Sequence, residues 1–65
     1  MPIITLEGPF ISKDQKAELA REFTATASRV IGLPPQAFVV VLKENNLENI
    51  ASGGQLLSDR EHAKA

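Results

Sequence analysis

Residues 38–42 read Phe-Val-Val-Val-Leu, an apolar run with no polar residue in alternation. Such a run is typical of a strand that is covered on both faces in a parallel sheet. Because side chains alternate between the two faces of a strand, Val39 and Val41 point away from Phe38 and Val40. A single helix can cover only one of these faces. The run therefore predicts a sheet whose second face is covered by another subunit.

The residues before this run complete a strand-helix-strand unit. Residues 3–6 are mostly branched and apolar, which predicts a short strand that starts almost at the first residue. Ser12 and Gln15 have the spacing of a capping box, and apolar residues then recur at steps of three and four up to Ile31. Gly32 and the prolines after it end this helix. The predicted fold class is α+β, a βαβ subunit with a right-handed crossover.

The residues after the second strand predict a short C-terminal hairpin arm. Gly53-Gly54 lies between the short apolar pieces Ile50-Ala51 and Leu56-Leu57, a pattern that favours a hairpin. Such an arm could pair with the edge strand of a neighbour. Residues 61–65 have no apolar anchor and are predicted to form a frayed tail. His62 lies in this tail and is given no role.

Length and composition limit what the chain can do. With 65 residues and no Cys, it is predicted to be one domain, 1–65, with a marginal core that oligomerisation stabilises. Seven Lys/Arg and eight Asp/Glu give a net charge of -1 without a basic patch, so we expect no nucleic-acid binding. The longest apolar run is far shorter than the roughly 20 residues that cross a bilayer, and no secretory leader is recognised. We expect a cytoplasmic protein without membrane association, metal or cofactor.

Pro2 is the residue with the clearest potential for chemistry. Once the initiator Met is removed, its nitrogen becomes a secondary amine whose direction is fixed by the ring. Apolar neighbours such as Ile3, Val39 and Val41 would lower the pKa of this amine toward neutrality, where general acid/base catalysis is most efficient. The alternative from the residues alone is a proline that merely starts an edge strand.

The order and spacing of several motifs resemble the 4-oxalocrotonate tautomerase family over essentially the whole chain. They are Pro2 directly before a strand, the Leu6-Glu7-Gly8 stop, the Asp14-Gln15-Lys16 helix start and the distal Gly53-Gly54 pair. The ending, residues 48–60, is most similar to DmpI-type members. The resemblance implies βαβ subunits that form dimers and then a hexamer, a trimer of dimers. It also implies an N-terminal proline, here Pro2, that moves a proton between carbon positions of an enol acid in aromatic catabolism.

The sequence departs from the family pattern where substrate is bound. The best-known members have two arginines that hold the carboxylate and polarise the carbonyl of the substrate, and these positions read Pro9 and Val39 here. Lys13 could enter the space of the first arginine. An active-site aromatic of those members falls on Ile50. Two lost guanidiniums remove bidentate carboxylate binding, so we expect inefficient turnover of a dicarboxylate.

Two further basic residues are candidates for substrate binding. Lys43 shares strand parity with Val39, and Arg60 lies on the distal arm. The alternative is that both are solvated surface charges, as charged residues in such positions usually are. Backbone amides near Gly53 could also stabilise an enolate oxygen.

Three functions remain open from the sequence. The leading hypothesis is a homo-oligomeric keto-enol tautomerase acting on a small 2-oxo or 2-hydroxydienoic acid. The second is hydrolytic dehalogenation of haloacrylates, which needs a carboxylate near the position of Ser52. The third is a non-catalytic or degenerate subunit of a tautomerase-like hexamer. If Met1 is retained, the nitrogen of Pro2 is an amide without basicity, and the proline mechanism fails.

Overall fold

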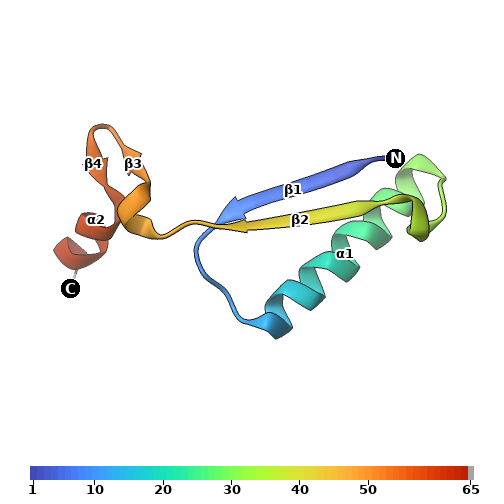
Figure 1. Cartoon of the computed structure of the whole chain (residues 1–65), viewed down its shortest axis with the longest axis horizontal. Helices are drawn as coiled ribbons and strands as arrows, with labels where there is room; N and C mark the ends of the chain where they lie inside the picture. The colour runs from blue at the N-terminus through green and yellow to red at the C-terminus, as the bar shows by residue number, and fades with distance from the viewer. Residues whose placement is uncertain (65) are drawn as a thin grey trace.

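The computed structural model describes the backbone of residues 1–64 and the side chains of residues 1–60. Its body is a βαβ unit, followed by a small separate arm (Figure 1). The body consists of β1 (Ile3–Gly8), α1 (Lys13–Ile31), η1 (Pro35–Ala37) and β2 (Val39–Glu44). The arm consists of η2 (Leu47–Asn49), β3 (Ala51–Ser52), β4 (Gln55–Leu56) and α2 (Leu57–Lys64). The predicted βαβ subunit with a C-terminal arm is confirmed.

Strands β1 and β2 pair in parallel, in a register that runs from Ile3 opposite Val39 to Gly8 opposite Glu44. Helix α1 covers the face that carries Ile4 (Figure 1). A groove of about 520 Å³ between this face and the helix is lined by Ile4, Phe23, Thr26, Ala27, Val30 and Ile31. On the opposite face Ile3 is 61% exposed and Val39 is 36% exposed. The predicted division into one covered and one uncovered face is confirmed for a single chain.

Helix α1 begins and ends where its capping residues predict. The Ser12 hydroxyl accepts the Gln15 N–H at 3.1 Å, and the Gln15 side chain accepts the Ser12 N–H at 3.0 Å. Gly32 adopts a left-handed φ of 84° and donates its N–H to the Ser28 carbonyl, which closes the last turn. The boundaries were therefore encoded locally.

The strands extend further than the apolar runs that predicted them. Strand β1 continues to Gly8, and β2 starts at Val39 and continues to Glu44. The extension includes the pair of Glu7 and Lys43. Because both side chains are charged, a pattern of apolar residues could not predict that the strands continue through this pair. The ladder continues there because strand pairing depends on backbone hydrogen bonds.

The arm has the predicted hairpin. Strands β3 and β4 pair antiparallel through Ala51 opposite Leu56, and the turn residues Gly53 and Gly54 have φ values of 61° and 83°. These left-handed angles explain why glycine occupies both positions. The backbone of α2 runs to Lys64. Ala65 and the side chains of residues 61–65 lie outside the described part, so the frayed tail and the absence of a role for His62 stay predictions.

A single copy of the chain has almost no core. Among the described residues, Phe38 alone is buried, at 8% exposure. The radius of gyration is 15.4 Å, whereas a compact domain of this length has about 11 Å. The difference arises because the arm extends away from the body, beyond the end of β2 (Figure 1). Both features favour assembly with other copies.

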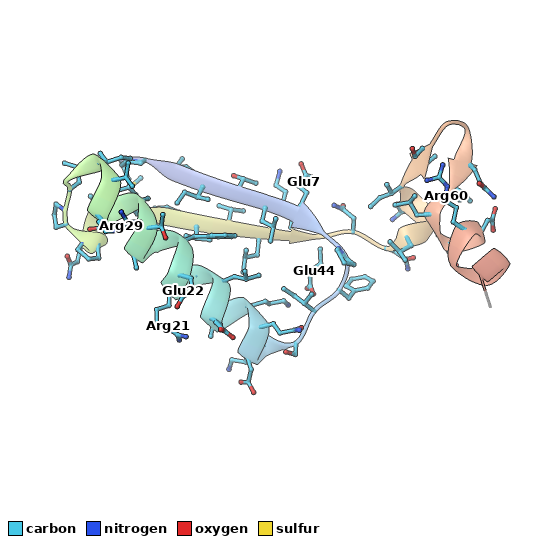
Figure 2. The ribbon with its side chains drawn as sticks, turned by 180° about the vertical axis from the view of Figure 1, so that it is seen from behind. Glu7, Arg21, Glu22, Arg29, Glu44 and Arg60 are labelled. Carbon is cyan, nitrogen blue, oxygen red and sulfur yellow. The ribbon has the colours of Figure 1, made fainter. Side chains whose placement is uncertain are left out.

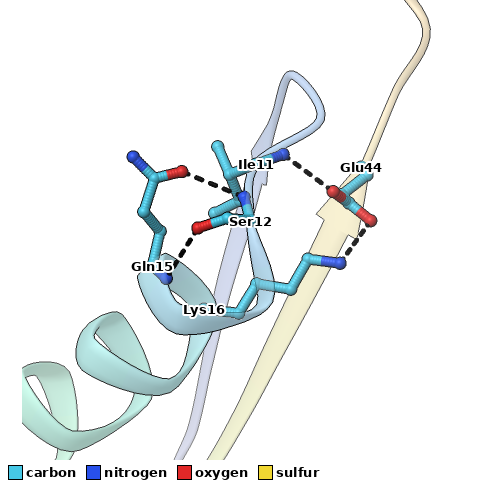
Figure 3. A network of polar contacts seen from close by, with 5 residues as sticks. All are labelled: Ile11, Ser12, Gln15, Lys16 and Glu44. Carbon is cyan, nitrogen blue, oxygen red and sulfur yellow. Dashed lines mark hydrogen bonds and ion pairs between the residues drawn. The ribbon is translucent and has the colours of Figure 1, made fainter.

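One polar network ties the far end of the sheet to the start of the helix (Figure 3). The Glu44 carboxylate accepts a hydrogen bond from Lys16 Nζ at 2.6 Å and another from the Ile11 N–H at 2.9 Å. The Lys16 hydrogen bond, and then the Ile11 N–H, hold the pKa of Glu44 below its ordinary value of 4.5. We call the four residues 9–12, together with this network, the clamped loop.

The exposed sheet face predicts that the isolated chain is not stable as a monomer. Sedimentation velocity at micromolar concentration is expected to report an oligomer. Ile3→Lys places a charge on the uncovered face and should shift the protein toward smaller species, because a buried, unpaired charge is costly. Ala25→Lys, on the exposed side of α1, is the matched control and should leave the assembly intact. A folded wild-type monomer would contradict this prediction.

Glu44 also predicts how stability depends on pH. Because its pKa is lowered on folding, the stability it contributes is fully present above pH 4.5 and is lost as the pH falls through the lower folded-state value. Glu44→Gln should therefore lower the melting temperature at neutral pH, and its difference from wild type should shrink on acidification. Thermal melts at one fixed protein concentration test this, with exposed Glu48→Gln as control. A difference that does not change with pH would refute it.

Candidate active site

Pro2 is held at the N-terminal end of β1. Its carbonyl accepts the Val39 N–H at 3.0 Å, which joins it to β2 one residue before the strand pairing begins. Pro2 is half-buried, whereas Met1 is 85% exposed. The proline therefore has a fixed position that does not depend on packing by Met1.

Two of the apolar neighbours predicted for Pro2 adjoin it in the structure. Ile3 follows it directly, and Val39 is bonded to it across the ladder. Val41 pairs with Thr5, two residues further along the strand, so it is the most distant of the three predicted neighbours.

The two lysines predicted to bind substrate lie far from Pro2 in the chain. Lys43 is on the same sheet face as Val39, as its parity predicts, but it pairs with Glu7 near the opposite end of the ladder. Four residues of strand separate Lys43 from Val39, which is about 13 Å. Lys13 is exposed at the start of α1, also at that opposite end (Figure 1). One chain therefore does not bring these lysines to its own proline.

The two candidates on the arm are also remote from the N-terminus (Figures 1 and 2). Arg60 donates from Nη2 to the Ser52 carbonyl at 3.1 Å and from Nε to the Gln55 side chain at 3.3 Å. These bonds connect α2 to both strands of the hairpin. Ile50 is half-buried where the arm begins, and its carbonyl accepts the Leu57 N–H at 2.9 Å. Within one chain, both residues serve the internal structure of the arm.

Sequence reasoning missed three residues that the structure places at the two ends of the sheet. Arg29, in the last turn of α1, lies at the same end as the N-terminus (Figure 2). Phe10 is 64% exposed beside the far end, and a large apolar side chain in a turn could have signalled a binding surface. Glu44 had no such signal, because Ile11 and Lys16 lie 33 and 28 residues away in sequence.

Over the part of the chain that the structure describes, no three His, Cys, Asp or Glu side chains gather as a metal site. None of the helices within that part is both long and apolar enough to cross a membrane.

The chain matches the sequence model of the family described as tautomerase enzyme over residues 2–60. The protein belongs to the tautomerase family. The matched segment starts at Pro2 and ends at Arg60, so it includes both the βαβ body and the arm with its hairpin. The resemblance that the sequence motifs indicated is confirmed.

Solved tautomerase structures have the same fold along nearly the whole chain. TomN, a 4-oxalocrotonate tautomerase homologue in the tomaymycin biosynthetic pathway, is 26% identical with a TM-score of 0.92, covering 98% of this chain and 100% of TomN. The 4-oxalocrotonate tautomerase homologue TTHB242 is 33% identical with a TM-score of 0.83, over 91% and 95%. DmpI from Archaeoglobus fulgidus is 28% identical with a TM-score of 0.83, over 89% and 100%. A search of curated proteins gives no significant match.

Proposed function

We propose that the protein is a keto-enol tautomerase in which the nitrogen of Pro2 is the acid/base group. The observation that carries this proposal is the position of Pro2, half-buried and bonded to Val39 at 3.0 Å, as the first residue of the tautomerase match. A base must be aimed at the proton it removes, and the ring together with the strand provides that aim.

The chemistry requires removal of Met1. Because Met1 is 85% exposed, its removal breaks few packing contacts, and the nitrogen of Pro2 becomes a secondary amine. The neutral amine takes a proton from an enol hydroxyl or from the carbon next to a carbonyl. It returns a proton at a conjugated carbon, so the amine is regenerated and no cofactor is consumed. The apolar neighbours Ile3 and Val39 support a neutral amine near pH 7.

We infer that the working unit is a homo-oligomer, because one chain leaves the proline site incomplete. In the two-stranded sheet, β1 and β2 each have one edge without a neighbouring strand. If two subunits related by a two-fold axis pair through the same strand, the two copies of that strand run antiparallel. Such pairing places the far end of one subunit beside Pro2 of the partner subunit. The resulting four-stranded sheet still has one uncovered apolar face, which supports further association, a trimer of dimers.

The substrate is proposed to be a small enol or 2-oxo acid with a single carboxylate. Pro9 and Val39 stand where the best-known relatives have two arginines, and one face of the site is therefore apolar. Lys13, Lys43 and Arg60 of another subunit are candidates to hold the one carboxylate.

A second candidate function is a non-catalytic subunit of a tautomerase-like oligomer. It is favoured by the loss of the two arginines and by Arg60, which bonds to Ser52 and Gln55 within its own arm. Haloacrylate dehalogenation has less support, because Ser52 stands where a water-activating carboxylate is required.

Replacing the proline tests the proposed base. General acid/base groups contribute about 10²- to 10⁴-fold, so Pro2→Ala should lower kcat/KM for ketonisation of the enol of phenylpyruvate by a factor in that range. Intact mass establishes that Met1 is absent, and sedimentation establishes equal assembly. Pro34→Ala, in the connection before β2, is the control and should retain activity. A Pro2→Ala variant within about twofold of wild type excludes Pro2 as the base.

Restoring one guanidinium tests the proposed substrate class. Val39→Arg should raise kcat/KM for a dicarboxylate dienol by about tenfold or more, since a charge-assisted hydrogen bond contributes about 1.5 to 3 kcal/mol. The activity toward a monocarboxylate should change less. Ala25→Arg, at an exposed position nearer the middle of α1, introduces the same side chain outside the proline end and is the control. High wild-type activity on the diacid with no gain from Val39→Arg would show that another cation already binds it.

A further inference from the structure

The clamped loop, residues 9–12, combines a fixed backbone with outward-facing side chains. Its Ile11 N–H is bonded to Glu44 at 2.9 Å, and just before it the Gly8 carbonyl accepts the Asn45 N–H at 2.8 Å. Phe10 is nevertheless 64% exposed, and Lys13, the first residue after the loop, is also exposed. The loop backbone is thus held from β2 through Ile11 (Figure 3), while the side chains of Phe10 and Lys13 are exposed.

This combination is more typical of a recognition element than of a simple connection. A ring that is 64% exposed buries only a minor part of its apolar surface in the single chain. Rigid loops that present aromatic and charged groups are common in binding sites. The Glu44 carboxylate belongs to β2, and its two partners belong to the loop and to the first turn of α1. It is therefore the group that fixes the loop to the sheet.

The loop lies at the end of the sheet opposite to Pro2. Gly8, its neighbour, pairs with Glu44, while Ile3 pairs with Val39. A two-fold, antiparallel association of strand edges exchanges these ends, so the loop of one copy reaches the proline end of the other. Such an association would bring Phe10 and Lys13 of one copy to the proline end of the other, where Arg29 of the same chain is the cation already present.

We propose that Glu44 is a positioning residue, which holds the clamped loop so that Phe10 and Lys13 contact substrate at Pro2 of the partner subunit. This inference rests on the proposed function. It assigns a role in substrate binding to Glu44, which lies on the helix-covered side of the sheet. Glu44 touches no substrate and acts through the loop. Its effect should therefore be on substrate binding, while the protonation of Pro2 stays unchanged.

The first experiment compares Glu44→Ala with wild type, using the enol of phenylpyruvate as the probe. Loss of the loop hydrogen bonds should raise KM by about three- to tenfold with little change in kcat. The pH at which the free enzyme loses activity through Pro2 should not move. Glu44→Gln retains an oxygen that can accept the Ile11 N–H, so it should restore KM most of the way toward wild type. Glu22→Ala, an exposed carboxylate on α1, is the control.

The second experiment tests whether the loop acts across subunits. Glu44→Ala and Pro2→Ala chains are mixed, unfolded and reassembled together. In a mixed pair, one site combines an intact Pro2 with an intact loop, so activity with the wild-type KM should reappear. If the loop served its own chain, every site with an intact proline would keep the raised KM. If Glu44→Ala does not assemble, Glu44→Gln replaces it in the mixture, and its smaller rise in KM should likewise be removed.

The outcomes separate this inference from the proposed function. A wild-type KM for assembled Glu44→Ala, or a mixture that retains only the raised KM, overturns the positioning role while Pro2 stands as the base. Full activity of Pro2→Ala overturns the proposed function itself. A change confined to melting temperature would show that Glu44 only stabilises the fold.

Discussion

The parallel pairing of β1 with β2 is the constraint on which the rest of this structure depends. It places Ile3 beside Val39 and leaves both on a face that α1 does not cover. It also fixes the N-terminus, because the Val39 N–H that continues the ladder is bonded to the Pro2 carbonyl. A two-stranded sheet with one helix cannot bury both faces of apolar strands. The same ladder therefore fixes the position of the candidate base and leaves one apolar face of the sheet uncovered in the single chain.

The two ends of this ladder are held by different kinds of hydrogen bond, backbone bonds at one end and both backbone and side-chain bonds at the other. At the proline end a backbone hydrogen bond from the Val39 N–H to the Pro2 carbonyl continues the ladder beyond the paired residues. At the other end a bond from Asn45 to Gly8 and the Glu44 network hold the clamped loop and the first turn of α1. If Pro2 is the base, as proposed above, the site of proton transfer lies at the opposite end of the sheet from the exposed Phe10 and Lys13. Antiparallel association of two copies would bring these complementary ends together.

The arm is a part of the chain that lies outside the βαβ body. Its hairpin turn is fixed by the two left-handed glycines, and Arg60 connects the last helix to both hairpin strands. Because the arm extends from the body, it gives little stability to the single chain and offers its surface to other copies (Figure 1). The bonds of Arg60 within the arm also explain why a basic residue in that position is not by itself evidence for substrate binding.

The sequence by itself determined the elements and the family. The capping residues of α1, the glycines of the hairpin and the apolar run at 38–42 act through local backbone geometry or simple alternation, so they can be read without coordinates. The motif order around Pro2 likewise indicated a tautomerase, and the family match agrees. Only the tertiary structure decided that Lys13 and Lys43 lie at the opposite end of the sheet from their own proline, and that Glu44 holds the loop. The physical reason is that strand register and a hydrogen bond across 33 residues depend on how the chain folds back on itself, which no local pattern encodes.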